Sequence, residues 1–494
     1  MQTLEILVQG LDARIIGNIA TSVKDVVQHS DRVSEGAIFI ARSGVRRDGA
    51  AFIDDAIGKG ATVIVCTPEV ARSLSHRNVA IIETCDPCYV GAVIAERFHG
   101  NPSKKLKLVG VTGTNGKTTI AWLVQHILST SGKKCGMLGT IVCDDGIATE
   151  QSTLTTPSFC DIGKILHSMV DNGCEVAVME CSSHALDQGR VAALDFDIGV
   201  FTNLSGDHLD YHGSADAYLL AKMKLFDVVS THAIINMDDP ASWAVADRTT
   251  AKVISCRTES DAATSWVEII DEKLNGSELR MHGNWGVFDV RIPLIGKHNA
   301  INALQAATVA YELGVQGDQI KVAIACAVSP PGRLERVQSE GSTVFVDFAH
   351  TDDALEQMLW SVRDVLPEGG KLHVVFGCGG DRDKSKRPRM GCVASTVGDI
   401  AYATSDNPRS EDPEKILDEV IGGVPKDRLP LVHRIVDRKE AIQRAIGSAA
   451  DCDVVVIAGK GHEKNQILLD RVIPFDDIEV ATEAIRMRAM SKQK

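Results

Sequence analysis

The sequence lacks any apolar run of the roughly 18–20 residues that a membrane-spanning helix needs, and its first residues form no basic leader. It also lacks an excess of positive charge, because 52 Lys and Arg face 66 Asp and Glu and leave a formal charge of −14. Such an acidic surface is not expected to bind nucleic acid or anionic membranes non-specifically. We therefore expect a cytoplasmic protein that meets anionic ligands with local devices: helix N-termini, single arginines and metal ions.

Paired cysteine motifs are nearly absent. The thirteen cysteines are an odd number, and several stand in apolar stretches, which predicts reduced, buried thiols rather than a disulfide framework. Examples are Cys66, Cys174, Cys326, Cys378 and Cys452. The single C-x-x-C, Cys85-Asp-Pro-Cys88, has no second pair or nearby histidine cluster to complete a zinc site. A turn through Asp86 and Pro87 is the favoured interpretation, and a redox or metal site is the alternative.

Low-complexity tracts and internal repeats are absent as well. A length of 494 residues suggests about three domains at roughly 150 residues each. Short β-rich and helical runs alternate along the chain, and polar stretches with Pro or Gly interrupt them near residues 100–105 and 329–333. We therefore predict three α/β domains: residues 1–102, 103–328 and 329–494.

The strongest motif lies at the start of the predicted central domain, Gly110-Val-Thr-Gly-Thr-Asn-Gly-Lys-Thr-Thr119. It follows an apolar strand and precedes a helical pattern, so its backbone N–H groups can surround phosphate oxygens at a helix N-terminus. Lys117 would reach the terminal phosphates, and the Thr118 hydroxyl would hold Mg²⁺. The spacing departs from G-x-x-x-x-G-K-[ST], since Val111 stands where the first glycine is expected. The motif predicts a nucleoside triphosphate site formed by Gly113, Thr114, Asn115, Gly116, Lys117, Thr118 and Thr119.

Two further strands end in polar residues, and ligands gather beyond the carboxyl ends of parallel strands. Glu180 ends the strand that begins at Glu175 and is well placed to bind the magnesium ion of a nucleotide. The polar block after the next strand contains Asp207, His208, Asp210 and His212. Taken alone, each histidine is more often a packed or exposed loop residue than a ligand. Proximity to the P-loop favours His208.

These residues resemble the shared sequence blocks of the ATP-dependent Mur ligases of peptidoglycan synthesis, most closely those of the branch that adds the third amino acid. The matching blocks run in one order over nearly the whole chain: Gly113-Thr-Asn-Gly-Lys-Thr, Ser182-Ser-His-Ala-Leu-Asp-Gln-Gly-Arg-Val, Asn203-Leu-Ser-Gly-Asp-His-Leu-Asp, Gly296-Lys-His-Asn-Ala-Ile-Asn, Gly377-Cys-Gly-Gly-Asp-Arg-Asp, Asp406-Asn-Pro-Arg and Gly459-Lys-Gly-His-Glu. The resemblance implies a central P-loop mononucleotide-binding domain with a parallel sheet and a Rossmann-like C-terminal domain. It also implies a reaction in which ATP phosphorylates a carboxylate, an amine attacks the acyl phosphate, and phosphate leaves.

The resemblance further implies two magnesium ions, with Thr118, Glu180 and His208 among their ligands. It implies a CO₂-derived carbamate on Lys222, which would turn a cation into an anion able to help hold the second metal. Lys117, Lys222 and His208 are thus the implied catalytic residues. From the residues alone, Lys222 and its neighbour Lys224 would be solvated helix charges, because a sequence does not reveal a CO₂ adduct.

For the rest of ATP, the resemblance points to Asn299 and Asn302 in the central domain and to Arg333, Asp347 and His350 in the third. ATP would then bridge the two domains, so that closure could assemble the site. Capping of the helix predicted from Asn299 onward is the alternative role of the two asparagines.

The resemblance assigns the nucleotide-sugar substrate to Ser30, Thr155, Thr156, Ser182, Gln188 and Arg190. Three positions depart from the family pattern, since Asp31 replaces an arginine, Val45 a histidine and Leu154 an asparagine. These departures bear on details of uridine and sugar binding rather than on the class of substrate.

The block Asp406-Asn407-Pro408-Arg409 bears on which amino acid is added. Meso-diaminopimelate differs from lysine by a second carboxylate, which a guanidinium can bind with two parallel hydrogen bonds. The resemblance therefore favours diaminopimelate over lysine. It completes the amino-acid pocket with Arg382, Gly459 and Glu463, and Glu463 would receive the remote ammonium group. A surface turn is the alternative role of Arg409.

The activity implied is ATP-dependent addition of meso-diaminopimelate to UDP-N-acetylmuramoyl-L-alanyl-D-glutamate by a monomer. The ligands would be these two small molecules and ATP, without nucleic acid or membrane. Three alternatives are an L-lysine-adding ligase of the same family, a folylpolyglutamate synthetase, and a nucleotide-binding scaffold that has lost catalysis. Arg409 argues against the first, the extra N-terminal domain against the second, and the retained Lys117, Glu180 and His208 against the third.

Overall fold

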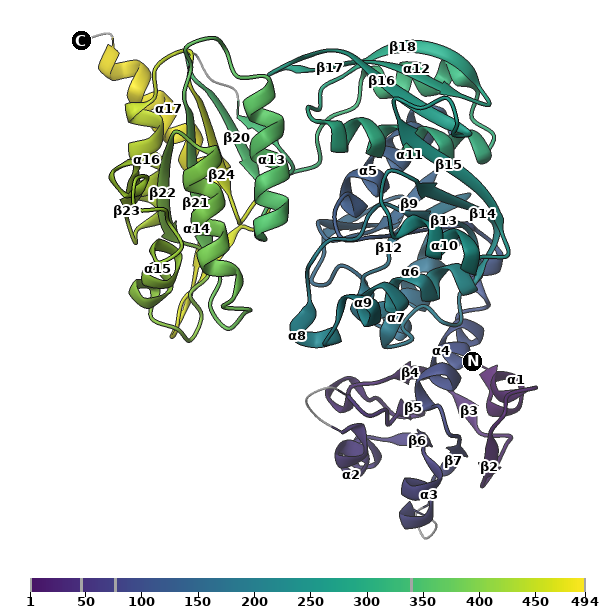
Figure 1. Cartoon of the computed structure of the whole chain (residues 1–494). Coiled ribbons are helices and arrows are strands. Elements are labelled where there is room, and N and C mark those ends of the chain that lie inside the picture. The colour runs from purple at the N-terminus through teal and green to yellow at the C-terminus, as the bar shows by residue number, and fades with distance from the viewer. Residues whose placement is uncertain (1, 45–47, 75–77, 338–340, 493–494) are drawn as a thin grey trace.

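The computed structural model describes residues 2–44, 48–74, 78–337 and 341–492. Its helices and strands form three lobes in chain order, each built around its own β-sheet: N-terminal in purple, central in teal, and C-terminal in green to yellow (Figure 1). Three α/β lobes confirm the predicted fold class, while the residue boundaries between the domains stay a prediction. No helix within these described ranges is long and apolar enough to cross a bilayer.

The N-terminal lobe has a five-stranded sheet in the order β2-β7-β6-β5-β4, parallel except for the pair β2 and β7. Its strands are β2 (Arg14–Ile16), β4 (Asp25–Val27), β5 (Ala37–Ile40), β6 (Ala61–Cys66) and β7 (Ala80–Glu83), and β1 (Gln2–Thr3) pairs separately with β3 (Ser22–Val23). The helices are α1 (Leu4–Val8), α2 (Ile53–Gly58), α3 (Pro68–Leu74) and α4 (Pro87–Phe98). The fully buried β5 reads as a continuous apolar run because both of its faces are covered.

The central lobe has an eleven-stranded sheet in the order β11-β10-β9-β12-β8-β13-β14-β15-β16-β17-β18. The strands are β8 (Lys107–Thr112), β9 (Cys135–Leu138), β10 (Val142–Asp144), β11 (Thr149–Gln151), β12 (Val176–Glu180), β13 (Phe196–Phe201), β14 (Val229–Asn236), β15 (Lys252–Thr258), β16 (Ser265–Lys273), β17 (Gly276–Gly283) and β18 (Gly286–Ile292). Its helices are α5 (Lys117–Thr130), α6 (Phe159–Asp171), α7 (Ser183–Asp187), α8 (Leu209–His212), α9 (Ala215–Met223), α10 (Ser242–Arg248), α11 (Lys297–Glu312) and α12 (Gly317–Ala325). Seven neighbouring strands of this sheet run parallel, as expected: β9, β12, β8, β13, β14, β15 and β16.

Both edges of this sheet are antiparallel, which the sequence analysis did not anticipate. At one edge, two residues join β16 to β17 and two join β17 to β18. Such short connections permit only antiparallel pairing, whereas parallel neighbours need a crossover. Helix α11 packs against α5 and against this extended sheet.

The C-terminal lobe has a six-stranded sheet in the order β19-β20-β24-β21-β22-β23, parallel apart from the edge strand β19. Its strands are β19 (Glu335–Val337), β20 (Thr343–Asp347), β21 (Leu372–Cys378), β22 (Ile400–Ser405), β23 (Val432–Arg434) and β24 (Val454–Ala458), followed by the hairpin β25 (Asn465–Ile467) and β26 (Val472–Pro474). The helices are α13 (Asp352–Asp364), α14 (Lys386–Val397), α15 (Pro413–Ile421), α16 (Arg438–Ser448) and α17 (Asp477–Lys492).

The cysteines are free, but they are not uniformly buried as predicted: Cys326 and Cys452 are exposed, whereas Cys66 is buried. Cys326 directly follows α12, and Cys452 lies in the turn between α16 and β24, so both stand outside the helices and strands that bury the apolar runs. In the C-x-x-C segment, the Asp86 side chain accepts a hydrogen bond from the backbone N–H of Tyr89 and caps α4. The segment is therefore a helix N-terminus.

The sheet order places the expected chemistry at one edge. Strand β8 lies between β12 and β13, and all three run parallel. The P-loop after β8, Glu180 at the end of β12 and the polar block after β13 therefore share the carboxyl edge of the central sheet.

Candidate active site

The P-loop joins β8 to α5 through two glycines whose backbone conformations other residues rarely adopt. Gly113 and Gly116 have φ angles of 142° and 86°. An added Cβ would lie 1.8 Å from Thr202 Oγ1 at Gly113 and 2.5 Å from Asn302 Oδ1 at Gly116. Gly110 instead lies inside β8, so the turn depends on the two later glycines and the unusual spacing of the motif is accommodated.

Two amines, one half-buried and one buried, meet at one backbone carbonyl of this loop. Lys117 Nζ donates to Gly113 O at 2.9 Å and to Thr114 O at 2.7 Å, and Lys222 Nζ donates to Gly113 O at 2.7 Å. Burial lowers the pKa of Lys117. Burial also lowers the pKa of Lys222 well below its ordinary value, and the charge of Lys117 adds to that effect. The ammonium form of both amines is thus less favoured than in an exposed lysine, and an anionic phosphate bound beside Lys117 would favour its ammonium form again.

Lys222 is not the solvated helix charge that the residues alone predict. It is 1% exposed, and its Nζ lies 4.2 Å from the centre of the Tyr218 ring. Lys224 does behave as predicted, since it is exposed and its Nζ lies 2.8 Å from Asp187 Oδ1. The helical pattern could not separate the two lysines, because α9 ends between them and a 3₁₀ turn begins at Lys224.

Glu180 lies at the end of β12 as predicted and is 1% exposed. Its Oε2 accepts hydrogen bonds from the hydroxyls of Thr118 and Thr140, each at 3.0 Å. Its Oε1 accepts from the backbone N–H of Thr140 at 2.7 Å. A carboxylate and a hydroxyl are therefore held together beside the P-loop, and such oxygens are the ligands that Mg²⁺ prefers.

His208 precedes the short helix α8 with a φ angle of 54°. Its Nε2 lies 3.3 Å from Asp207 Oδ2, and its ring centre lies 4.7 Å from that of His184. Loss of hydration lowers the pKa of His208 to about 4 against the opposing effect of Asp207, and Lys117 and Lys222 lower it further. A neutral imidazole is the form that binds metals.

The rest of the polar block does not join His208. His212 Nε2 lies 3.0 Å from Ser183 Oγ, and Asp210 is exposed. Across the part of the chain that the structure describes, no three His, Cys, Asp or Glu side chains lie close enough to hold a metal by themselves. Any metal here would depend on threonine, substrate and water oxygens as well.

A cavity of about 80 Å³ lies between the central and C-terminal lobes. Its walls include Asn115, Gly116 and Thr119 of the P-loop segment, Asn299 and Asn302 of α11, and Arg333 and Asp347 of the C-terminal lobe. Arg333 reaches across the lobes, because its Nη2 donates to Thr118 Oγ1 at 3.3 Å. Its buried Nε has no hydrogen-bond partner within the described chain. This cavity thus brings together residues from both sides of the predicted ATP site.

Two predicted nucleotide contacts need comment. Helix α11 begins after Gly296, and Asn299 Nδ2 donates to Ile295 O at 2.8 Å, so the asparagines do not cap the helix as the alternative held. His350 is not among the lining residues, and its Nδ1 lies 2.9 Å from Phe348 O. Asp347 accepts hydrogen bonds from two backbone N–H groups at 2.7 Å, and burial raises its pKa.

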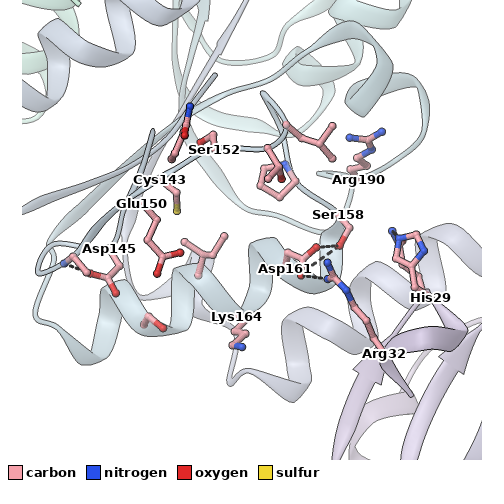
Figure 2. Close-up of a pocket in the computed structure, with 18 of the residues that line it drawn as sticks. His29, Arg32, Cys143, Asp145, Glu150, Ser152, Ser158, Asp161, Lys164 and Arg190 are labelled. Atoms are coloured by element: carbon pink, nitrogen blue, oxygen red, sulfur yellow. Dashed lines mark hydrogen bonds and ion pairs between the residues drawn. The ribbon is translucent and has the colours of Figure 1, made fainter. Parts of the chain in front are cut away.

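A cavity of about 670 Å³ lies between the N-terminal and central lobes (Figure 2). Figure 2 shows Arg32 and His29 reaching from the N-terminal lobe toward Ser158 and Asp161, and Arg32 Nη1 donates to Asp161 Oδ1 at 3.0 Å. Arg190 and other residues of the central lobe complete the walls. A cavity of this size, with cationic side chains on its walls, suits a nucleotide-sized anionic ligand.

The sequence analysis predicted Arg190 but missed the two arginines that the N-terminal lobe adds to this cavity. Ser30 is not among its lining residues, whereas Arg32 and Arg42 are. The sequence did hold a signal for Arg32. Asp31 stands where the family pattern has an arginine, and Arg32 follows directly, so the arginine is present one position later. Leu154 lines the cavity and is 53% exposed, and Val45 lies outside the described residues.

Four of the predicted substrate contacts form one hydrogen-bonded group. Thr156 Oγ1 donates to Glu180 O at 2.7 Å and accepts from the backbone N–H of Ser182 at 3.0 Å. Arg190 Nη1 donates to Thr156 O at 2.7 Å, and its Nη2 donates to Gln188 Oε1 at 2.8 Å. Thr155 Oγ1 lies 3.1 Å from Thr140 Oγ1, which joins this group to the carboxylate beside the P-loop.

The predicted amino-acid residues gather at the carboxyl edge of the C-terminal sheet. Arg409 lies in a turn with a φ angle of 51°, but it is half-buried rather than a surface residue, and its Nη1 donates to Gly380 O at 2.7 Å. A Cβ added to Gly379 would lie 2.9 Å from Arg409 Nη1 and 3.7 Å from Arg382 Cγ, which places both arginines beside this loop.

In the same cluster, Asn407 Nδ2 donates to Glu463 Oε2 at 2.8 Å. Asp406 and Asn407 are 8% and 3% exposed. Gly459 has a φ angle of 115°, and its backbone N–H donates to Asp347 O at 3.0 Å, which links this cluster to the ATP side. The site therefore offers both cationic and anionic groups to a ligand.

Comparison with known proteins identifies the family. Models of three Mur ligase segments match the chain: the family's catalytic domain at residues 23–97, its middle domain at 111–310 and its glutamate ligase domain at 332–461. The chain is also 40% identical over 475 residues to a UDP-N-acetylmuramoyl-L-alanyl-D-glutamate--2,6-diaminopimelate ligase of Trichormus variabilis, with 95% of each chain covered. The chain belongs to the Mur ligase family.

Other relatives of this Mur ligase carry the same name, including one of Synechococcus elongatus that is 42% identical over 469 residues and covers 93% of each chain. A solved structure of a UDP-N-acetylmuramoyl-L-alanyl-D-glutamate--2,6-diaminopimelate ligase matches with 30% identity, a TM-score of 0.69 and 99% of each chain covered. An ADP complex of the MurF ligase of Thermotoga maritima shares the fold, with 19% identity, a TM-score of 0.62 and coverage of 95% of this chain and 99% of that one.

Proposed function

We propose that this Mur ligase adds meso-diaminopimelate to UDP-N-acetylmuramoyl-L-alanyl-D-glutamate at the expense of ATP, as a cytoplasmic monomer. The carrying observation is the cluster at the carboxyl edge of the C-terminal sheet, where Arg409, Arg382 and Asp406 all lie beside Gly379 and Glu463 is hydrogen-bonded to Asn407. Diaminopimelate carries a remote carboxylate and a remote ammonium group, so a site with both signs of charge complements it. The names of relatives at about 40% identity agree with this assignment.

The chemistry proceeds in two steps. A carboxylate oxygen of the nucleotide-sugar dipeptide attacks the γ-phosphorus of ATP, the bond from that phosphorus to the bridging oxygen breaks, and ADP leaves. The amine nitrogen of the amino acid then attacks the acyl carbon, the carbon–oxygen bond to phosphate breaks, and the nitrogen loses a proton. Lys117 and Arg333 neutralise charge in the first step, because one lies in the P-loop and the other contacts Thr118 from the opposite lobe.

Magnesium fits the residues present. The buried carboxylate of Glu180, hydrogen-bonded to the Thr118 hydroxyl, would supply oxygen ligands. The lowered pKa of His208 favours the neutral imidazole, which could add a nitrogen ligand. When bound, the ion offsets charge on the transferring phosphoryl group.

Lys222 could help to hold a second magnesium ion only as a carbamate, not as an amine. An amine is not the hard oxygen ligand that Mg²⁺ prefers, whereas a carbamate supplies two oxygens and a negative charge. Only a neutral amine reacts with CO₂, losing a proton as the nitrogen–carbon bond forms. The strongly lowered pKa of the buried Lys222 supports this modification.

The L-lysine-adding activity is the second candidate, and the position of Arg409 argues against it, because lysine has no second carboxylate for that guanidinium. A scaffold without catalysis is disfavoured by the intact cluster of Lys117, Lys222 and Glu180.

The test is phosphate release by the purified protein with the nucleotide-sugar dipeptide and Mg²⁺-ATP. Release is expected with meso-diaminopimelate, and L-lysine should be far less effective. With the D-glutamyl carboxylates labelled by ¹⁸O, one labelled oxygen should appear in the released phosphate, as an acyl phosphate requires. The proposal is wrong if release is independent of diaminopimelate, and the acyl phosphate is wrong if the phosphate carries no label.

A further inference from the structure

A buried ammonium group lies beneath the Asp406–Arg409 segment. Lys460 follows Gly459 after β24, and its side chain is 0% exposed. Its Nζ donates to Asn407 Oδ1 at 3.1 Å, to Glu463 Oε2 at 3.1 Å and to Asn465 O at 2.6 Å. An ammonium group has three donors, and these acceptors use all three.

The acceptors of Lys460 come from two parts of the chain, one after β22 and one after β24. Asn407 follows β22, Glu463 lies in the loop after β24, and Asn465 begins the hairpin of β25 and β26. The hairpin is bound to the first segment as well, because the backbone N–H of Ile467 donates to Asn407 Oδ1 at 3.0 Å. Lys460 is therefore the common partner of all three acceptors.

The two carboxylates near Lys460 also favour a cation at this position. Asp406 Oδ1 lies 3.8 Å from Lys460 Nζ and, within the described residues, has no hydrogen-bond partner. Glu463 Oε2 lies 3.1 Å from the same ammonium group. Two carboxylates that share a largely buried pocket repel each other, and an ammonium group between them offsets that repulsion. Removing it would let Glu463, the more exposed of the two, swing away from Asn407.

We propose that Lys460 is a positioning residue for the added amino acid, holding Glu463 and Asn407 in the arrangement that receives the remote ammonium group of the substrate. This inference rests on the proposed function. Lys460 does not contact the ATP cavity, so its effect falls on the amino acid and not on the nucleotide.

The test compares Lys460→Met with Lys464→Met. The first removes the buried charge at similar length and should raise the KM for diaminopimelate roughly 10-fold or more, as loss of a supporting partner does. The KM values for ATP and the nucleotide-sugar dipeptide should change less than about twofold, which a general loss of folding would not give. Lys464 is the matched control, since its side chain is half exposed and pairs with Asp476 away from these acceptors, and its variant should behave as wild type. An unchanged KM for diaminopimelate in Lys460→Met overturns the inference.

A double-mutant cycle with Glu463→Gln tests whether Lys460 acts through Glu463. The double variant should have nearly the KM of Glu463→Gln alone, because Lys460 would then have no carboxylate to position. If the two substitutions instead raise the KM for diaminopimelate independently, so that their factors multiply in the double variant, the positioning role is contradicted. Should Lys460→Met fail to fold, Lys460→Arg keeps the charge but not the three-acceptor geometry. It too should raise the KM for diaminopimelate, and an unchanged KM would again overturn the inference.

The wild-type protein separates this inference from the proposed function. Activity with L-lysine but not diaminopimelate would refute the proposed function, and Lys460→Met would then be judged by its KM for lysine. Activity with diaminopimelate together with a wild-type KM in Lys460→Met would refute only the role of Lys460.

Discussion

The P-loop end and the amino-acid end of the site hold their positive charges in different ways. At the P-loop end, Lys117 donates to the backbone carbonyls of Gly113 and Thr114, which carry no net charge. At the amino-acid end, Lys460 is bonded to the carboxylate of Glu463, whereas Arg409 donates to the backbone carbonyl of Gly380. The ammonium group at the P-loop end is thus left uncompensated, whereas the buried ammonium group at the amino-acid end is paired in advance.

This difference matches what each end has to bind. Moving a phosphoryl group between two anions needs cations that are not already neutralised, and a chain with a formal charge of −14 must concentrate them locally. An amino acid with two carboxylates and two ammonium groups needs both signs of charge at defined places. Substitutions at the P-loop end should therefore lower the rate, and those at the amino-acid end should change affinity and selectivity.

Lys117→Met should have the largest effect. It removes a cation that only backbone carbonyls now engage, and we expect a fall in kcat of roughly 10³-fold, as for other donors that stabilise developing charge. Steady-state phosphate release measures it. Lys107→Met is the control, because Lys107 lies at the opposite end of β8, is exposed and pairs with Asp197. A Lys117→Met variant with half the wild-type rate would contradict the uncompensated-charge account.

Lys222→Met should lower the rate by roughly 10²-fold, since it removes the group that would carry the carbamate. Bicarbonate should restore the activity of CO₂-depleted wild type but not that of the variant, and Lys224→Met should match wild type. In the intact protein, ¹³C-bicarbonate should give a carbamate NMR signal that grows as pH rises, because only the neutral amine reacts. The lowered pKa of Lys222 should let that signal appear at lower pH than it would for an ordinary lysine. Its absence at every pH would remove the carbamate from the mechanism.

Arg409→Ala should have a smaller effect that falls mainly on selectivity. Loss of a charge-assisted contact costs about 1.5–3 kcal/mol, which is a rise of about 10- to 100-fold in the KM for diaminopimelate. The KM for lysine should hardly change, so the preference between the two collapses. Arg434→Ala is the control, because Arg434 is exposed in the same lobe and pairs with Glu414 and Asp418. Retained selectivity in Arg409→Ala would show that another group reads the second carboxylate.

The sequence was most informative where function follows from local order along the chain. The P-loop and Glu180 could be placed because each directly follows an apolar strand, and parallel strands bring their carboxyl ends to one edge. The three-lobed α/β fold followed from alternating patterns and length. The antiparallel edges did not, because periodicity alone does not reveal which strands pair.

Burial and contacts between distant segments could not be predicted. Lys222 and Lys224 look alike in sequence, yet one is buried over Tyr218 and the other is exposed. Arg32 lines the large cavity although Ser30 was the residue expected there, because a 3₁₀ turn sets which side chains face inward. Lys460 lies within the Gly459-Lys-Gly-His-Glu block that matches the family. Its role could not be predicted, because its acceptors include a residue 53 positions away.

The most direct test of the account is a competition experiment. The wild-type protein is given the nucleotide-sugar dipeptide, Mg²⁺-ATP and equal concentrations of meso-diaminopimelate and L-lysine, and the products are distinguished by mass. We predict that the diaminopimelate product accumulates in large excess and that phosphate is released in equal amount. A predominant lysine product, or phosphate release without either product, would contradict the account.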